Sequence, residues 1–171
     1  MTAVSNSSPL IFLSKIDDLM ELAKEIHKNI LISEEVYKEV VEIGLLSEKP
    51  SIKNNALKIK QLASSGFIKT IKLKPHRLKH SLSERLGIGE ASAICLALQE
   101  NIKEVLIDEK AVTVVAKELG LKPLPISSLP IIAFKNGMIK KEAAERIIDK
   151  LVLEHYYLNA SDYKLLIRLL E

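Results

Sequence analysis

The chain has 171 residues, of which 47% are hydrophobic and 27% are charged, and its formal net charge at pH 7 is +3. This length and composition suit one domain with a single core, and they exclude a disordered or fibrous protein; the small charge predicts no particular partner. No apolar run approaches the roughly 18 residues that span a bilayer, and the N-terminus lacks the basic-then-apolar layout of a secretory signal. We therefore expect a cytoplasmic protein with no membrane partner.

Short apolar strands alternate with helical patterns along the chain. We expect strands at 2–5, 30–32, 67–73, 104–107 and 122–126. Helical patterns occupy 9–27, 33–46, 51–65, 88–101, 109–119, 127–136, 139–153 and 161–170. This alternation predicts a parallel sheet covered by helices on both faces, a three-layer α/β/α sandwich. We expect one domain over 1–171, with an α/β core at 1–137 and appended helices at 138–171, where no strand pattern remains.

Polar residues follow the first and fourth predicted strands. The first strand ends in Asn6, Ser7 and Ser8, and Ser8 with Pro9 is typical of a helix N-cap and first helical residue. The fourth strand runs into Asp108 and Glu109. Parallel sheets bind ligands at the carboxyl ends of their strands, so Asn6 and Asp108 lie side by side there if the two strands are neighbours. The alternative interpretation of Asp108 is a cap for the helix that follows it.

Two predicted helices each bring one more acid to the apolar side. At 100° per residue, Val36, Val40 and Ile43 form a stripe, and Glu39 lies about 40° from Ile43. Glu90 heads an almost wholly apolar helix and is its sole charge before position 100. The alternatives are that Glu39 is a solvated edge residue and that Glu90 merely interacts with the positive end of the helix dipole.

The four polar residues Asn6, Glu39, Glu90 and Asp108 thus converge on one end of the predicted sheet. Clustered carboxylates repel one another unless they share protons or bind a hard cation, and Mg²⁺ and Mn²⁺ prefer oxygen ligands. The pattern therefore predicts a metal site, and this prediction rests on the group rather than on any one acid.

The pattern resembles the PIN-domain superfamily and, within it, the DUF3368 branch. The resemblance rests on five stretches that occur in order along the chain: "VSNSSPLIFLSKI", "ILISEEVYKEVVE", "GIGEASAICLAL", "VLIDEKAVTVVAKELGL" and "FKNGMIKKEA". It implies a sheet of five strands in the order 3-2-1-4-5. It also implies an acidic pocket that binds Mg²⁺ or Mn²⁺ and hydrolyses RNA, as in the VapC-type toxins of toxin–antitoxin pairs.

Carried over by position, the resemblance implies that Asn6, Glu39, Glu90 and Asp108 bind the metal and that the three acids are catalytic. Glu90 and Asp108 would hold the ion, whereas Glu39 either accepts a proton from water or joins the ligands. Ser7 and Glu109 are possible additional members of the site.

The departure from metal-dependent PIN nucleases is Asn6, where aspartate is usual. An amide oxygen can ligate Mg²⁺ but brings no negative charge, so the site binds cations more weakly than an all-carboxylate site. The alternative function is therefore a catalytically weak or inactive module that binds RNA or a protein.

Several basic residues lie where an RNA backbone could run, or alternatively form ordinary solvated surface. They are Lys15, Lys72, Lys74, Arg77, Lys79 and Lys110. The expected partners are RNA, a small antitoxin protein and a second copy of the chain in a homodimer, the antitoxin being expected from the resemblance alone.

Overall fold

A five-stranded parallel sheet forms the centre of the computed structural model, which describes residues 1–75 and 77–171. Its strands are β1 (Thr2–Ser5), β2 (Asn29–Ser33), β3 (Ile68–Ile71), β4 (Glu104–Leu106) and β5 (Lys122–Leu124). They lie in the order β3-β2-β1-β4-β5, and every neighbouring pair is parallel. The predicted fold class and strand order are confirmed.

Helices connect the strands and continue after β5. They are α1 (Ser7–Lys15), α2 (Asp17–Ile26), α3 (Glu34–Tyr37), the π-helix η1 (Lys38–Ile43), α4 (Pro50–Ser64), α5 (Arg77–Ser83), α6 (Ile88–Gln99), α7 (Lys110–Glu118), the 3₁₀-helix η2 (Ile126–Ser128), α8 (Leu129–Lys135), α9 (Lys141–Leu153) and α10 (Ala160–Arg168). Among the described residues, no helix offers an apolar stretch of the length that spans a bilayer.

The first helical region differs from the predicted single helix over 9–27. The backbone is extended at Ile16, which divides the region into α1 and α2. Helix α1 begins at Ser7, so Asn6 rather than Ser8 occupies the N-cap position. Pro9 fits within the first turn because the first four N–H groups of a helix have no partner inside it.

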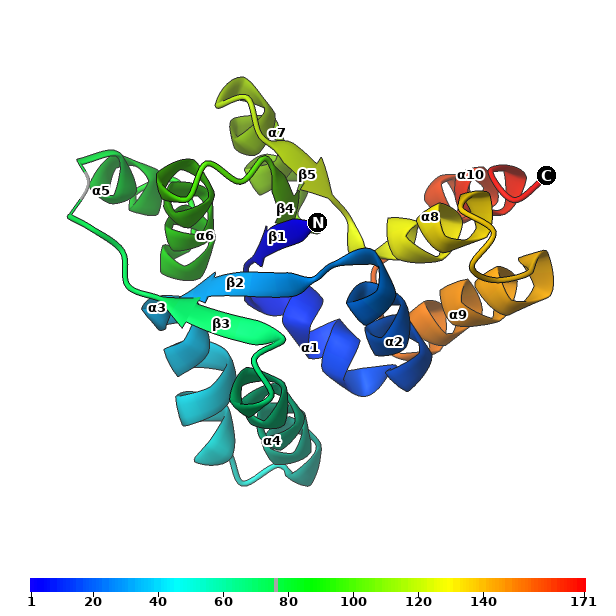
Figure 1. Cartoon of the computed structure of the whole chain (residues 1–171), viewed down its shortest axis with the longest axis horizontal. Helices are drawn as coiled ribbons and strands as arrows, with labels where there is room; N and C mark the ends of the chain where they lie inside the picture. Colours follow the sequence, from blue (N-terminus) through cyan, green and yellow to red (C-terminus); the bar gives the residue numbers. More distant parts are fainter. Residues whose placement is uncertain (76) are drawn as a thin grey trace.

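The alternation of side chains along the strands builds a core on each face of the sheet. Ala3, Ile30, Ile32 and Leu106 belong to one buried cluster, and the residues next to them, Val4, Leu31, Val105 and Ile107, belong to another. The first face is covered by α1, α2 and α4, and the second by α5, α6 and α7 (Figure 1). This is the layered arrangement that strands buried on both sides require.

The C-terminal helices α8, α9 and α10 gather at one end of the molecule, beside α2 (Figure 1). The segment 138–171 also contributes to the main core, because Ile147, Leu151 and Tyr156 are buried in the same cluster as strands β1 and β2. A smaller cluster ties the C-terminal helices together through Ile131, Ala144, Ile148, Leu166 and Leu170.

The segment after β2 changes its helical geometry. The Oγ of Ser33 accepts a hydrogen bond from the Val36 amide, which caps α3. The chain then forms the π-helix η1, in which each turn holds more residues than an α-helical turn. The expected apolar stripe therefore fails at Ile43, whose exposed fraction is 57%, while Val40 and Val41 are buried. Glu39 lies in this π-helix.

Candidate functional site

A pocket of about 460 Å³ lies at the carboxyl ends of the central strands. It joins the end of β1, the start of α1, η1, the start of α6 and the connection after β4. Its lining consists of Asn6, Ser7, Ser8, Ile11, Glu39, Gly87, Ile88, Gly89, Glu90 and Glu109. The structure therefore brings Asn6, Glu39 and Glu90 together, as well as the two possible additional members Ser7 and Glu109.

The Asn6 side chain is a buried part of the lining of this pocket. Asn6 is 2% exposed, and its Nδ2 donates to Oε2 of Glu109 at 3.2 Å. Its Oδ1 is buried and has no hydrogen-bond partner among the described residues. A buried carbonyl oxygen without a partner is costly, so this atom is the first candidate for contact with a ligand.

Glu39 reaches the pocket from η1 and is held by Ser7 at the start of α1. The Ser7 Oγ donates to Oε2 of Glu39 at 2.6 Å. Gly89 makes room for this contact, because a Cβ at position 89 would lie 3.0 Å from the same Oε2 and 3.5 Å from the Ser7 Oγ. A Cβ at position 89 would thus press on the Glu39 carboxylate, whereas its contact with the Ser7 hydroxyl would be an ordinary one.

Glu90 lines the pocket and also satisfies the start of its own helix. Its Oε2 accepts a hydrogen bond from the Gly87 amide at 2.8 Å. An acid in the first turn also interacts favourably with the positive end of the helix dipole. Glu90 therefore lines the pocket and caps the start of its own helix at the same time.

Asp108 is placed differently from the prediction, because it does not line the pocket and does not cap α7. Its Oδ1 accepts hydrogen bonds from the Tyr156 hydroxyl at 2.6 Å and from the Ile126 amide at 2.9 Å. Its Oδ2 is buried without a partner among the described residues. Burial raises the pKa of Asp108 to about 6, although both hydrogen bonds favour the ionised form.

Each of these acids thus accepts a hydrogen bond from a different neighbour. Among the described residues, no group of three or more His, Cys, Asp or Glu side chains is close enough to hold a metal ion. The donor chemistry nevertheless fits Mg²⁺ or Mn²⁺, because every donor is an oxygen and two buried oxygens, Asn6 Oδ1 and Asp108 Oδ2, have no partner within the described chain. Both follow adjacent strands, since Ser5 of β1 is paired with Leu106 of β4.

The basic residues expected to contact RNA fall into two groups. Lys15 pairs with Glu154 and lies over the Phe12 ring, and Lys79 forms an ion pair with Glu35. The exposed lysines are Lys72 and Lys74, after β3, and Lys110, next to Glu109. The Arg77 side chain lies outside the described part of the structure.

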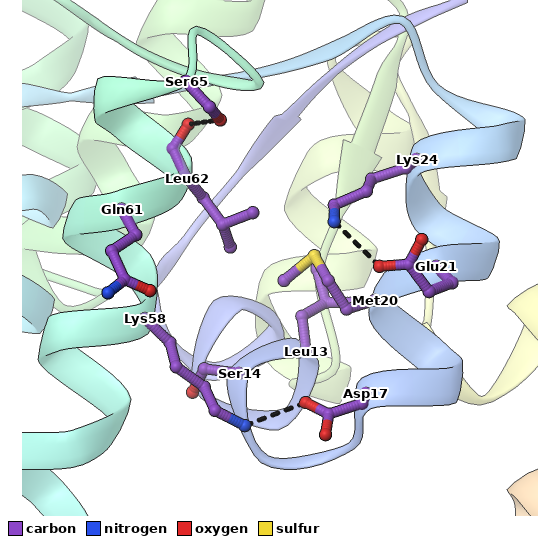
Figure 2. A pocket seen from close by; sticks show the side chains of 10 residues that line it. All are labelled: Leu13, Ser14, Asp17, Met20, Glu21, Lys24, Lys58, Gln61, Leu62 and Ser65. Atoms are coloured by element: carbon purple, nitrogen blue, oxygen red, sulfur yellow. Dashed lines mark hydrogen bonds and ion pairs between the residues drawn. The ribbon is translucent and has the colours of Figure 1, made fainter.

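A second hollow, of about 410 Å³, lies between α4 and the helices α1 and α2 (Figure 2). Its lining residues are Leu13, Ser14, Asp17, Met20, Glu21, Lys24, Lys58, Gln61, Leu62 and Ser65. Its two acids are already paired, Asp17 with Lys58 and Glu21 with Lys24, each at 2.8 Å. This hollow therefore lacks the unpaired carboxylates of the strand-end pocket.

The family model for DUF3368, described as PIN domain, matches residues 2–171, nearly the full chain, and this agrees with the strand order and the strand-end pocket. The chain belongs to the DUF3368 family of PIN domains. A comparison with the curated proteins gave no match. A PIN domain is a nuclease-like fold, and PIN domains generally use divalent metal ions.

Sequence reasoning missed two residues that shape this PIN domain. Tyr156 reaches Asp108 from 48 positions away, and no pattern in its surroundings indicated this contact. Gly89 sits inside the motif "GIGE", and a glycine within a helix was the available signal, because it suggests close approach by another group.

Proposed function

We propose that this PIN domain is a ribonuclease that depends on Mg²⁺ or Mn²⁺. In this proposal Asn6, Glu39, Glu90 and Asp108 hold the ion, and Glu109 joins them or orients Asn6. The observation that carries the proposal is the pair of buried oxygens without partners, Asn6 Oδ1 and Asp108 Oδ2, at the ends of adjacent strands. A divalent cation would satisfy both atoms and would offset the repulsion among the carboxylates.

Side chains of the protein take the other roles in this proposal, which are proton transfer and contact with the RNA backbone. A divalent ion in such a site supplies an activated water and neutralises charge on the phosphate. Glu39 is the most exposed of the acids and is held through Oε2, so its Oε1 is available either to accept a proton from water or to bind the ion. Lys110, exposed beside Glu109, and the exposed Lys72 and Lys74 are proposed contacts for the RNA backbone.

The proposal is tested by incubating labelled single-stranded RNA with the purified protein in Mn²⁺ and in chelator. We expect cleavage only with the ion, and a loss of at least about tenfold in Glu39→Gln and Asp108→Ala. Glu42→Gln is the matched control, because Glu42 is an exposed acid of the same π-helix outside the pocket. Cleavage that persists in chelator or that survives Asp108→Ala undiminished would defeat the metal mechanism.

A second candidate function is an RNA- or protein-binding module with little or no catalysis. This reading is favoured by the hydrogen bonds that already engage three acids, from Ser7 to Glu39, from the Gly87 amide to Glu90 and from Asn6 to Glu109. A pocket satisfied in this way has less need of an ion. Binding of RNA without cleavage at any Mn²⁺ concentration would support this second candidate against the first.

A toxin role, a small antitoxin partner and a homodimer belong to the proposal through the family resemblance. Growth arrest on expression of the chain alone, and light scattering of the purified protein at twice the mass of one chain, are the results that this part of the proposal predicts.

A further inference from the structure

The connection between α9 and α10 reaches from the C-terminal helices to the end of β4. Tyr156 lies in this connection, is 8% exposed and donates its hydroxyl hydrogen to Oδ1 of Asp108 at 2.6 Å. A buried tyrosine hydroxyl needs a polar partner, and here the partner is Asp108, which follows β4. The contact joins the C-terminal helices to one of the acids proposed to hold the ion.

The two donors to Asp108 determine how its carboxylate is oriented. Tyr156 and the Ile126 amide both donate to Oδ1, and no described residue donates to Oδ2, which is buried. If an ion binds Asp108, Oδ2 is the oxygen left for it. This division of the two oxygens resembles the way in which outer hydrogen bonds orient metal ligands in general.

Tyr156 is itself fixed by α1. Its ring packs edge-on against the Phe12 ring, with the ring centroids 5.0 Å apart and the planes at 85°. The Lys15 ammonium lies 5.0 Å from the centroid of the Phe12 ring and pairs with Glu154 at 3.7 Å. The tyrosine is thus held by the same helix whose first residue, Ser7, lines the pocket.

We infer that Tyr156 is a positioning residue of the metal site, which holds Oδ1 of Asp108 and leaves Oδ2 for the ion. The inference rests on the proposed function, and it gives the C-terminal segment a part in the site beyond packing. A purely structural Tyr156 would affect the stability of the fold but not the ion affinity of the folded protein.

The test compares Tyr156→Phe, which removes only the hydroxyl, with Tyr157→Phe, a control at an 84% exposed neighbour. Calorimetric titration with Mn²⁺ is carried out well below the unfolding temperature of each variant. We expect Tyr156→Phe to weaken Mn²⁺ binding about 10- to 100-fold and Tyr157→Phe to leave it unchanged. Wild-type affinity in Tyr156→Phe overturns the inference but leaves the proposed function standing. A wild-type protein that binds no Mn²⁺ overturns both.

A second measurement needs no metal. In the NMR spectrum of the ion-free protein, the amide proton of Ile126 reports on Oδ1 of Asp108, to which it donates. We expect Tyr156→Phe to shift this resonance and Tyr157→Phe to leave it in place. An unchanged Ile126 resonance in Tyr156→Phe would mean that the hydroxyl does not position Asp108, and would overturn the inference.

Discussion

Asn6 donates its amide hydrogen to Glu109 Oε2 across 3.2 Å, while the oxygen of the same amide is buried without a described partner. The opposite orientation of the amide would place its oxygen against a carboxylate, so the electrostatics support the observed one. The amide therefore does two things at once. It neutralises none of the pocket's acids, yet it holds one of them in place and presents an oxygen to the site.

We expect Asn6→Asp to change ion binding and stability in opposite directions. The substitution puts a buried charge in place of the amide and sets it against Glu109, so the ion-free protein should lose about 1–3 kcal/mol of unfolding free energy. The added charge should strengthen Mn²⁺ binding about tenfold or more and should increase RNA cleavage.

The measurements for Asn6→Asp are thermal unfolding in chelator and in Mn²⁺, with Asn54→Asp, an exposed position of α4, as the control. A large gain of cleavage from a silent parent would favour the binding-module reading of the natural chain. Equal stability in chelator and in Mn²⁺ would contradict the metal site.

Gly89→Ala should reduce activity without a comparable loss of stability. A Cβ at this position lies 3.0 Å from the Glu39 Oε2, so the Glu39 carboxylate, which Ser7 holds, must shift by a few tenths of an ångström. Alanine also gains up to about 1 kcal/mol over glycine within a helix, which offsets part of the strain. We expect cleavage to fall several-fold while the unfolding free energy changes by less than about 1 kcal/mol.

The Gly89 effect is checked by repeating the substitution in a Glu39→Ala background. If alanine at position 89 acts by displacing Glu39, the substitution should cause no further loss of cleavage in the Glu39→Ala background. An equal loss in both backgrounds would mean that Gly89 acts on some other part of the pocket.

A buried chain of hydroxyls fixes α3 against α6. The Val36 amide donates to Ser33 Oγ, Ser33 and Ser92 share a hydrogen bond of 2.7 Å between their hydroxyls, and Ser92 Oγ donates to the Gly89 carbonyl. Both serines are fully buried. The Ser92 hydroxyl donates its hydrogen to the Gly89 carbonyl, so it must accept a hydrogen bond from the Ser33 hydroxyl. Each group in this hydrogen-bonded series therefore donates once.

Ser92→Ala should therefore cost about 1–3 kcal/mol of unfolding free energy, since it removes the buried acceptor of the Ser33 hydrogen. Ser64→Ala is the control, because the Ser64 hydroxyl also donates to a helical carbonyl, that of Lys60, but is exposed. Chemical unfolding of both variants provides the comparison. A cost for Ser92→Ala no greater than for Ser64→Ala would contradict this account.

His27 should make the fold less stable in acid. It is 1% exposed, and burial, together with the nearby N-terminal ammonium, lowers its pKa to about 4. Its Nδ1 lies 3.3 Å from Glu104 Oε1 without the geometry of a hydrogen bond. The unfolded chain thus binds a proton between about pH 6.5 and 4 that the folded chain does not, so stability falls as the pH falls through this range, by up to about 3 kcal/mol.

The Asp108 carboxyl changes the stability of the fold with pH in the direction opposite to His27. Its folded pKa of about 6 lies above the ordinary value, so the folded state binds the extra proton and this contribution to stability is lost as the pH rises towards 6. The effects of His27 and Asp108 on stability therefore partly cancel in the natural chain. Unfolding at pH 7 and 4.5 in Asp108→Asn removes the Asp108 contribution, and an NMR titration of the His27 ring distinguishes His27 from Glu104, whose pKa burial also raises. A midpoint near 6.5 would contradict the prediction.

Periodicity and strand ends were sufficient to predict much of this protein. The alternation of strands and helices predicted the α/β/α class, and the family resemblance implied the strand order. The ends of the strands and the apolar sides of the helices predicted Asn6, Glu39 and Glu90, which do line one pocket. These features are local or follow from sheet topology, so a single sequence carries them.

The rest depended on contacts that no local pattern carries. The Tyr156 hydroxyl and the Ile126 amide, both far along the chain, hold Oδ1 of Asp108, and the predicted apolar stripe fails at Ile43 because the segment forms a π-helix. Lys15 and Lys79 form ion pairs with acids of other elements, Glu154 and Glu35, which no local pattern indicated, and their contact with RNA stays a prediction. Contacts between remote elements decide the arrangement at Asp108, Lys15 and Lys79, and the local π-helix decides that at Ile43.

The central claim is that the strand-end pocket binds a divalent cation, and calorimetric titration of the purified protein with Mn²⁺ tests it most directly. The account predicts saturable binding by the natural chain, weakened at least about tenfold in Glu90→Gln and Asp108→Asn. The absence of saturable binding by the natural chain, or unchanged binding in both variants, would contradict it.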